Sequence, residues 1–458
     1  MPATEKKSNA VLAISLTGAA ADRAFSPGDT IVGNVVRRSP IVSPRARVSI
    51  KLCGRAKAKV VKKRNDSRHT YRSRFALIDE TQSSQLIFDG PLHIAAGADP
   101  ISWSFAITIP VHVSPKLASS DSQSFLPLDR ASVAQQRLPS TISVTGHNME
   151  TFVEYWLEAH LQDHGHQHDS FDATLPFPLR NYLTEPPSQS PPMKRLSQTF
   201  MIYSPRLDPN KADVELSTKE KLKKVFHTSS VPHLTIKAEV TAPSVIQLEP
   251  GSPNDTAGKH IPILVRILPD WDASAEGIRG IHQQVQLTRI SVRLKSYTLA
   301  QADGTFSPYT QDTDTSVELI HSACLRKLGY PLYLPFSESE PALDIGELLN
   351  VGVGYNGPLH GPLVPPTPYV SEIFACADGY NYRHTHALKW EMEFRVAMEE
   401  KKLEGRIPVR VLEGNDPRNV AADYTAPPPV EEANNDTWIQ PPDESEAPPS
   451  FAEAQKEK

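Results

Sequence analysis

Several clusters of reactive side chains give this sequence its first chemical indications. His160, Asp163, His164, His166 and His168 fall within nine residues, and imidazoles at such density can bind zinc or copper. No cysteine stands near them, and their spacing fits one short loop between two strands. We interpret them as a solvated hairpin loop, with adventitious metal binding as the alternative, and we predict neither a metal site nor a cofactor.

A glycine-rich stretch from Gly352 to Gly357 has the spacing of a dinucleotide fingerprint. That motif binds phosphate only where a helix begins directly after it. Pro358 and Gly361-Pro362 follow here, and because proline disrupts a helix interior, we predict a loop instead. The sequence also lacks the zinc-protease, phosphate-loop and nucleophile-elbow signatures. We predict that the protein is not an enzyme, with a triad assembled in space as the alternative.

The strongest charge signal is a basic stretch in a chain whose formal net charge is -5. Strand alternation in Arg55-Ala56-Lys57-Ala58-Lys59 would place three cations on one face, where they could attract anionic lipid or acidic cargo. The alternative is a lysine-rich edge strand that blocks aggregation between sheets. We do not expect nucleic-acid binding, because aromatic residues are scarce near these cations. The candidate membrane and cargo residues are Lys51, Arg55, Lys57, Lys59, Lys62, Lys63 and Arg64, and the stretch continues through Arg68, Arg72 and Arg74.

Strands are the elements that we expect to position these residues. The 42 prolines are about 9% of the chain against a typical ~5%, which disfavours long helices. Alternation from Ile101 to Ile109 predicts a strand with Trp103 and Phe105 on its buried face, and residues 153–161 repeat the pattern. In that second strand we expect Glu154, Glu158 and His160 to face solvent. Ser26-Pro27-Gly28-Asp29 predicts a type II turn.

Composition divides the chain into four regions. A first β series occupies residues 9–183, and a second returns at residues 231–413, which predicts two sandwiches in tandem. Residues 184–230 form a proline-rich linker that includes the one helical pattern, from Lys211 to Phe226. Between Ala300 and Val370 we expect long loops. Residues 414–458 are acidic and proline-rich and are predicted to be a disordered tail.

The order of the β segments resembles a fungal α-arrestin, also called an arrestin-related trafficking adaptor. The first domain resembles an arrestin N-terminal domain and the second, more loosely, an arrestin C-terminal domain. The resemblance implies an all-β fold of two tandem immunoglobulin-like arrestin sandwiches. The segments that carry it are Ser26–Asp29, Val48–Gly54, Leu86–Gly90, Trp103–Pro110 and Phe152–Leu161 in the first domain, and Leu234–Val240, Ile261–Ile267, Ile290–Leu294 and Leu388–Val396 in the second.

This resemblance implies a function in membrane-protein traffic. Arrestin-related adaptors bind transporters or receptors as cargo and link them to ubiquitination, endocytosis and protein transport. The alternative is an arrestin-fold scaffold or sorting subunit that acts without a ubiquitin ligase. The sequence has no apolar run of about 18 residues and no charged leader before an apolar core. We therefore expect a cytoplasmic protein that lies peripherally at the plasma membrane or endosomes.

The expected link to a ligase rests on proline motifs in the tail. Family members recruit WW-domain HECT-type ubiquitin ligases through Pro-Pro-x-Tyr, whose tyrosine fills a pocket beside the proline groove. Here Val430 and Phe451 stand where the tyrosine belongs, and phenylalanine keeps the ring while losing the hydroxyl. Ligase binding therefore stays open. The residues that would carry it are Pro427, Pro428, Pro429, Pro448, Pro449 and Phe451.

Overall fold

The structure is a computed structural model that describes residues 4–8, 11–17, 24–64, 67–163, 170–184, 191–211, 231–249, 260–359 and 372–418. By their contacts, residues Met1–Asn415 form one compact unit and Asp416–Lys458 a second. Several predictions lie outside the described residues. They concern the helical pattern after Lys211, the centre of the linker, His164, His166 and His168, the disordered tail, and the ligase motifs from Pro427 to Phe451.

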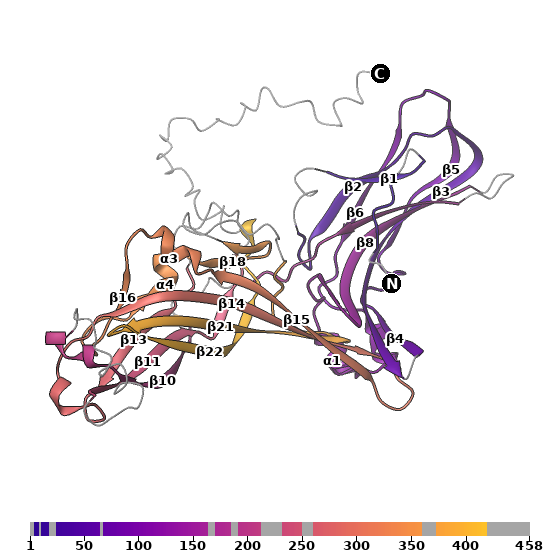
Figure 1. Cartoon of the computed structure of the whole chain (residues 1–458). Coiled ribbons are helices and arrows are strands. Elements are labelled where there is room, and N and C mark those ends of the chain that lie inside the picture. The colour runs from indigo at the N-terminus through magenta and orange to yellow at the C-terminus, as the bar shows by residue number, and fades with distance from the viewer. Residues whose placement is uncertain are drawn as a thin grey trace, which may run out of the picture. The chain divides into compact units, whose positions relative to one another are not determined.

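The first β series builds two antiparallel sheets (Figure 1). One has the strand order β1-β2-β6, with β1 at Ala13–Leu16, β2 at Thr30–Arg37 and β6 at Ile101–Thr108. The other has the order β4-β3-β8-β7, with β5 and β9 paired to β3 and β8. Its strands are β3 (Ile41–Arg64), β4 (Ser67–Ala76), β5 (Ser84–Ile94), β7 (Ile142–Gly146), β8 (Met149–Asp163) and β9 (Ser170–Phe177), and two short helices, η2 (Pro115–Ser119) and α1 (Arg130–Gln135), follow β6.

Local chemistry explains why these strands form where the alternation predicts them. In β6 the side chains of Trp103, Phe105 and Ile107 are buried, as predicted. The type II turn before β2 is confirmed, because Gly28 has φ +96° and the Asp29 N–H donates to the Ser26 carbonyl at 3.0 Å. The turn delivers the chain into β2, which pairs with β6 along its whole length.

The central strand β8 differs from its prediction on one face. Tyr155 and Leu157 are buried as expected, but Glu154 is also buried, with only 8% of its surface exposed. Its carboxylate accepts hydrogen bonds from the Arg55 guanidinium and from the Thr4 backbone N–H. The prediction that Glu154 faces solvent is wrong, because Arg55 of β3 and the N-terminal segment at Thr4 cover this part of the second face of β8.

The second β series builds two larger sheets and a small hairpin. One sheet has the order β10-β11-β13-β17, and the other runs β12-β22-β21-β14-β15 with β16 and β20 attached. The strands are β10 (Met193–Tyr203), β11 (His233–Pro243), β12 (Val245–Gln247), β13 (Leu264–Asp270), β14 (Val285–Ala302), β15 (Tyr309–Ile320), β16 (Leu332–Leu334), β17 (Leu343–Asp344), β18 (Gly352–Gly354), β19 (Gly357–Leu359), β20 (Ala377–Asp378), β21 (Tyr382–Val396) and β22 (Glu399–Leu412). The short helices are η3 (Pro205–Leu207), η4 (Pro209–Lys211), η5 (Glu276–Ile278), α3 (Ala323–Lys327) and α4 (Ile345–Leu348).

The all-β character is therefore observed, and among the described strands the pairing is antiparallel except where β12 meets β22. Much of the segment that we expected to be long loops, residues 300–370, instead forms strands and short helices. Two hydrophobic cores fill the described part of the chain. The first core includes residues of the second β series: Ala300, Ala302, Phe374, Tyr380 and Tyr382.

Candidate functional site

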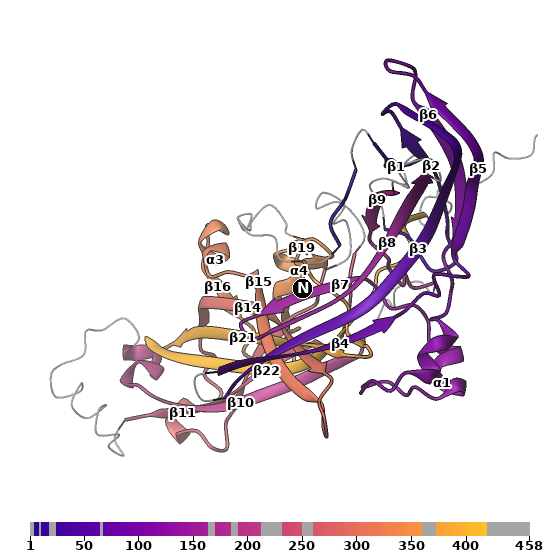
Figure 2. The ribbon, with the colours of Figure 1, turned by 90° about the vertical axis from the view of Figure 1, so that its right-hand side faces the viewer.

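The basic stretch lies on β3 with the alternation that the sequence predicts. Arg55, Lys57 and Lys59 point to the partly exposed face of the strand, while Ala56 and Ala58 between them are buried. The edge-strand alternative is wrong for β3, which pairs with β4, β5 and β8 and so lies inside its sheet, but it fits the arginines of β4, which is the border strand. Figure 2 shows β3 running between β4 and β8. The cations of β3 thus face side chains of both neighbouring strands.

Like charges stand opposite one another across β3 and β4. The register pairs Lys57 with Arg74 and Lys59 with Arg72. Both arginines are exposed, and neither has a recorded ion pair within the described residues. Like charges directly opposed in an antiparallel pair destabilise a sheet. The pKa of Lys57 is lowered accordingly, first by burial and then by the charges of Arg55 and Arg74.

These four cations line a small cavity of about 150 Å³, which we call the basic cleft. Its other wall comes from β8. The Lys59 ammonium lies 3.9 Å from the Glu150 carboxylate, and the Lys57 ammonium lies 5.9 Å from the centre of the Phe152 ring. One carboxylate therefore faces four cations, which leaves the basic cleft with an excess of positive charge. The lining residues are Lys57, Ala58, Lys59, Arg72, Ser73, Arg74, Glu150 and Phe152.

Two of the remaining predicted cations, Arg55 and Lys62, are engaged in the fold. Arg55 is bound to the buried carboxylate of Glu154, and its guanidinium lies 4.7 Å from the Trp156 ring centre. Lys62 donates to the Thr310 carbonyl of β15 at 2.6 Å. Lys63 is exposed, and the side chain of Arg64 lies outside the described residues. Within the predicted patch, the basic cleft is thus where four cations gather around one carboxylate.

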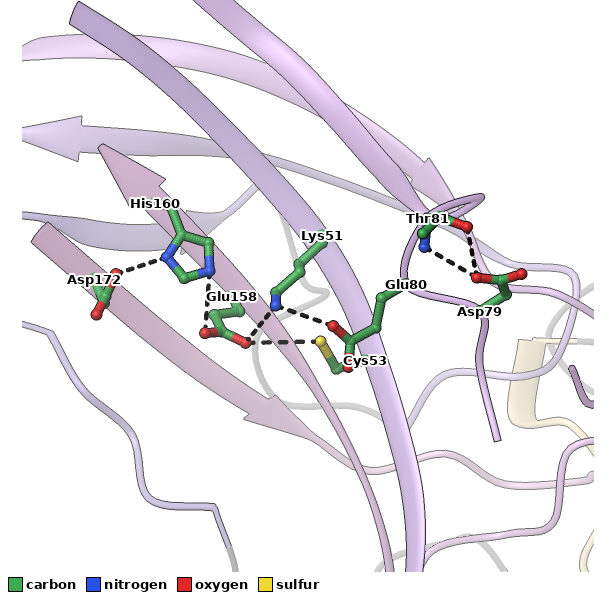
Figure 3. A network of polar contacts seen from close by, with 8 residues as sticks. All are labelled: Lys51, Cys53, Asp79, Glu80, Thr81, Glu158, His160 and Asp172. Atoms are coloured by element: carbon green, nitrogen blue, oxygen red, sulfur yellow. Dashed lines mark hydrogen bonds and ion pairs between the residues drawn. The ribbon is translucent and has the colours of Figure 1, made fainter. Parts of the chain in front are cut away.

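Lys51 belongs to a separate polar network on the same face of the sheet (Figure 3). Its ammonium lies 3.1 Å from the Glu80 carboxylate and 3.3 Å from that of Glu158. Glu158 also contacts His160 Nε2 at 3.1 Å, and His160 Nδ1 lies 2.6 Å from Asp172. Because two carboxylates neutralise it, Lys51 is not available to an external anion.

The close contacts in this network shift the pKa values of Glu158, His160 and Cys53. The hydrogen bond from His160 lowers the pKa of Glu158 to about 2, with a further contribution from Lys51. The same hydrogen bond raises the pKa of His160 above its ordinary value, despite partial burial. Burial and the neighbouring carboxylates raise the pKa of the Cys53 thiol to about 12. Cys53 is therefore a neutral thiol at physiological pH, and His160 is not the free solvent-facing imidazole that we predicted.

Two further features of the second β series bear on binding sites: the glycine-rich stretch and a group of possible metal ligands. The glycine-rich stretch forms the hairpin β18–β19, so a strand and not a helix begins at Gly357; the structure is a hairpin rather than the loop that we predicted. His260, Asp344 and Glu347 bring ligand atoms within 4.8 Å of one another, a grouping that sequence reasoning missed. Asp344 Oδ1 already accepts hydrogen bonds from the backbone of Ile263 and Glu347, so this carboxylate has a role in the fold.

No protein-family model matches this chain, and a search of the curated proteins finds no match. Within the described residues, no helix is both long and apolar enough to span a bilayer. The basic cleft is therefore the feature from which a function is best argued.

Proposed function

We propose that the protein is an arrestin-like adaptor that binds membrane-protein cargo and links it to ubiquitination, endocytosis and protein transport. The observation that carries this proposal is the basic cleft, where Lys57 and Lys59 face Arg74 and Arg72 at some cost to the sheet. An acidic segment of a cargo tail would supply carboxylates that relieve this repulsion. The adaptor would then act from the cytoplasm, at the plasma membrane or endosomes.

The arrestin resemblance, on which the cargo class rests, is consistent with where its segments lie. In the first series Ser26–Asp29 is the turn before β2, and the other segments lie largely in β3, β5, β6 and β8. Those of the second series fall in β11, β13, β14 and β21. The basic cleft also suits a peptide, because Phe152 offers an apolar side chain a contact beside the cations that would bind carboxylates.

Proximity labelling of membrane proteins by the full chain in cells tests the cargo proposal. Wild type should label a set of integral membrane proteins, and Arg72→Gln/Arg74→Gln should lose most of that set. A matched variant, Lys389→Gln/Arg395→Gln, removes two cations that are paired with Glu391 and Glu400 and should keep it. Equal labelling by all three chains would refute the cleft as the cargo site. Loss of phosphatidylserine-vesicle binding without loss of cargo would assign the cleft to lipid instead.

The link to a ligase is tested separately at the tail. If Phe451 occupies a WW-domain tyrosine pocket, Phe451→Ala should abolish the pull-down of WW domains, and Phe451→Tyr should strengthen it by about 1 kcal/mol through the restored hydroxyl. The missing tyrosines at Val430 and Phe451 favour the second candidate, a scaffold or sorting subunit that needs no ligase. Absence of WW binding to the wild-type tail would support that candidate while leaving the cargo proposal intact.

A further inference from the structure

The strand β10 forms the border of the sheet β10-β11-β13-β17. It pairs with β11 over eleven residues, and no strand of the described residues pairs with its other edge. Figure 1 shows β10 at the lower border of this sheet. An edge strand presents a row of backbone N–H and C=O groups that can accept a further strand.

The register shows which backbone groups face outward. Just before β10, the Pro192 carbonyl accepts a hydrogen bond from the Ser244 N–H at 2.8 Å, and just after it the Ser204 N–H donates to the Pro232 carbonyl at 3.2 Å. Residues of an antiparallel pair alternate between those that bond to the partner and those that point away. The even-numbered residues of β10 therefore bond to β11. The residues that turn their backbone outward include Met193, Arg195, Ser197, Thr199 and Met201.

The two cations of this edge, Lys194 and Arg195, lie at one end of β10, and the rest of the strand lacks the protection that exposed strands usually carry. Proteins normally guard such edges with charges, prolines or bulges. The edge strand β4 has Arg68, Arg72 and Arg74 along its length, whereas β10 has no charged residue from Leu196 to Tyr203. Apolar side chains are exposed on both of its faces: Met193 (38%), Leu196 (40%) and Met201 (45%). Such a strand is an aggregation hazard unless something covers it.

The outward-facing residues are self-complementary. From Met193 to Met201 they read Met-Arg-Ser-Thr-Met, with a methionine four residues away on each side of Ser197, and Tyr203 follows. A two-fold axis through Ser197 would place Met193 of one copy opposite Met201 of the other, and Arg195 opposite Thr199. Because Lys194 and Arg195 both lie near one end of β10, antiparallel pairing keeps the cations of the two copies apart, while parallel pairing would oppose them.

We propose that β10 is a dimerisation edge at which two copies of this chain pair as antiparallel strands about an axis at Ser197. The contact is isologous, so both copies use the same residues and the assembly closes at two. It joins the two four-stranded sheets into one and covers the exposed methionines. This inference is independent of the cargo and ligase proposals.

The mass of the full chain, measured by sedimentation or light scattering, tests the dimer. Between about 1 and 100 µM wild type should pass from monomer to dimer, since association follows mass action. Ser197→Pro removes an N–H that does not bond to β11, so the fold is kept while both hydrogen bonds across the axis are lost. We expect dimerisation to weaken at least about tenfold. Ser197→Ala keeps the N–H and should dimerise as wild type does.

Cysteine cross-linking tests the register. Ser197→Cys should form an intermolecular disulfide, because facing Cα atoms of a hydrogen-bonded pair lie about 5.5 Å apart. Thr199→Cys should not, because its two copies would lie about 14 Å apart along the strands. A chain that stays monomeric at all concentrations, a Ser197→Pro dimer as tight as wild type, or equal cross-linking at both positions would each overturn the proposal. If the chain stays monomeric, the edge of β10 would instead be open to a strand of a different protein.

Discussion

Removing the two arginines from the basic cleft is expected to make the folded protein more stable. Arg72→Gln/Arg74→Gln relieves two cross-strand repulsions, with Lys59 and with Lys57. Each like-charge pair costs about 0.2–1 kcal/mol, so the variant should gain on the order of 1 kcal/mol at low salt. With an unfolding entropy of about 2 cal/mol/K for each residue of the unit Met1–Asn415, this gain raises the unfolding midpoint by about 1 °C.

Differential scanning calorimetry at low and at high salt measures this gain. At about 1 M salt the Debye length is only ~3 Å, so the difference from wild type should vanish. The matched variant Lys389→Gln/Arg395→Gln should show no gain at low salt, because it loses ion pairs to Glu391 and Glu400. If the cleft variant is less stable than wild type at low salt, Arg72 and Arg74 support the fold and the case for a ligand site fails.

Two further predictions concern buried packing and pH. Gly405→Ala would place a Cβ 2.3 Å from Cζ2 of the buried Trp390, which should cost about 1–3 kcal/mol in urea denaturation, whereas an unchanged midpoint would contradict this packing. The pKa of His160 is raised in the folded protein, so its charged form stabilises the fold below pH 6.5, and this stabilisation is lost as pH rises through the folded-state pKa. The pKa of Glu158 is lowered, so its charged form stabilises the fold above pH 4.5, and this stabilisation is lost as pH falls toward about 2. His160→Gln should therefore lose most stability between pH 4.5 and 6.5, and a loss that is the same at every pH would refute the coupling.

Period-two alternation predicted the strands well where one face packs on a core. In β6 every second residue is buried, so Trp103 and Phe105 could be placed from sequence. The rule failed at Glu154 because β8 is covered on both faces, and a carboxylate opposite Arg55 can then be buried. It also failed between residues 300 and 370, because β15 is polar and exposed along most of its length and the other strands there, with two or three residues each, carry no periodic signal.

Only the β3 side of the basic cleft could be predicted from the sequence. The cations of β3 follow from alternation, but their repulsive partners follow from the register of β4, in which Arg64 pairs with Ser67. The turn-favouring dipeptide Asn65-Asp66 could have suggested that register. Nothing local in the sequence indicates that Glu150 and Phe152 face the same cavity, since β8 lies about 90 residues further along the chain.

The first hydrophobic core has a consequence for how the chain is made. Its own β series ends near Leu179, yet the core is completed by Tyr380 and Tyr382 of the second series. At about 5–20 residues per second, a ribosome needs roughly 10–40 s to synthesise the ~200 residues between them. During this interval the first β series has left the ribosome, but its hydrophobic core still lacks the rings of Tyr380 and Tyr382. Nascent chains of this protein should therefore depend on chaperones until synthesis has passed β21.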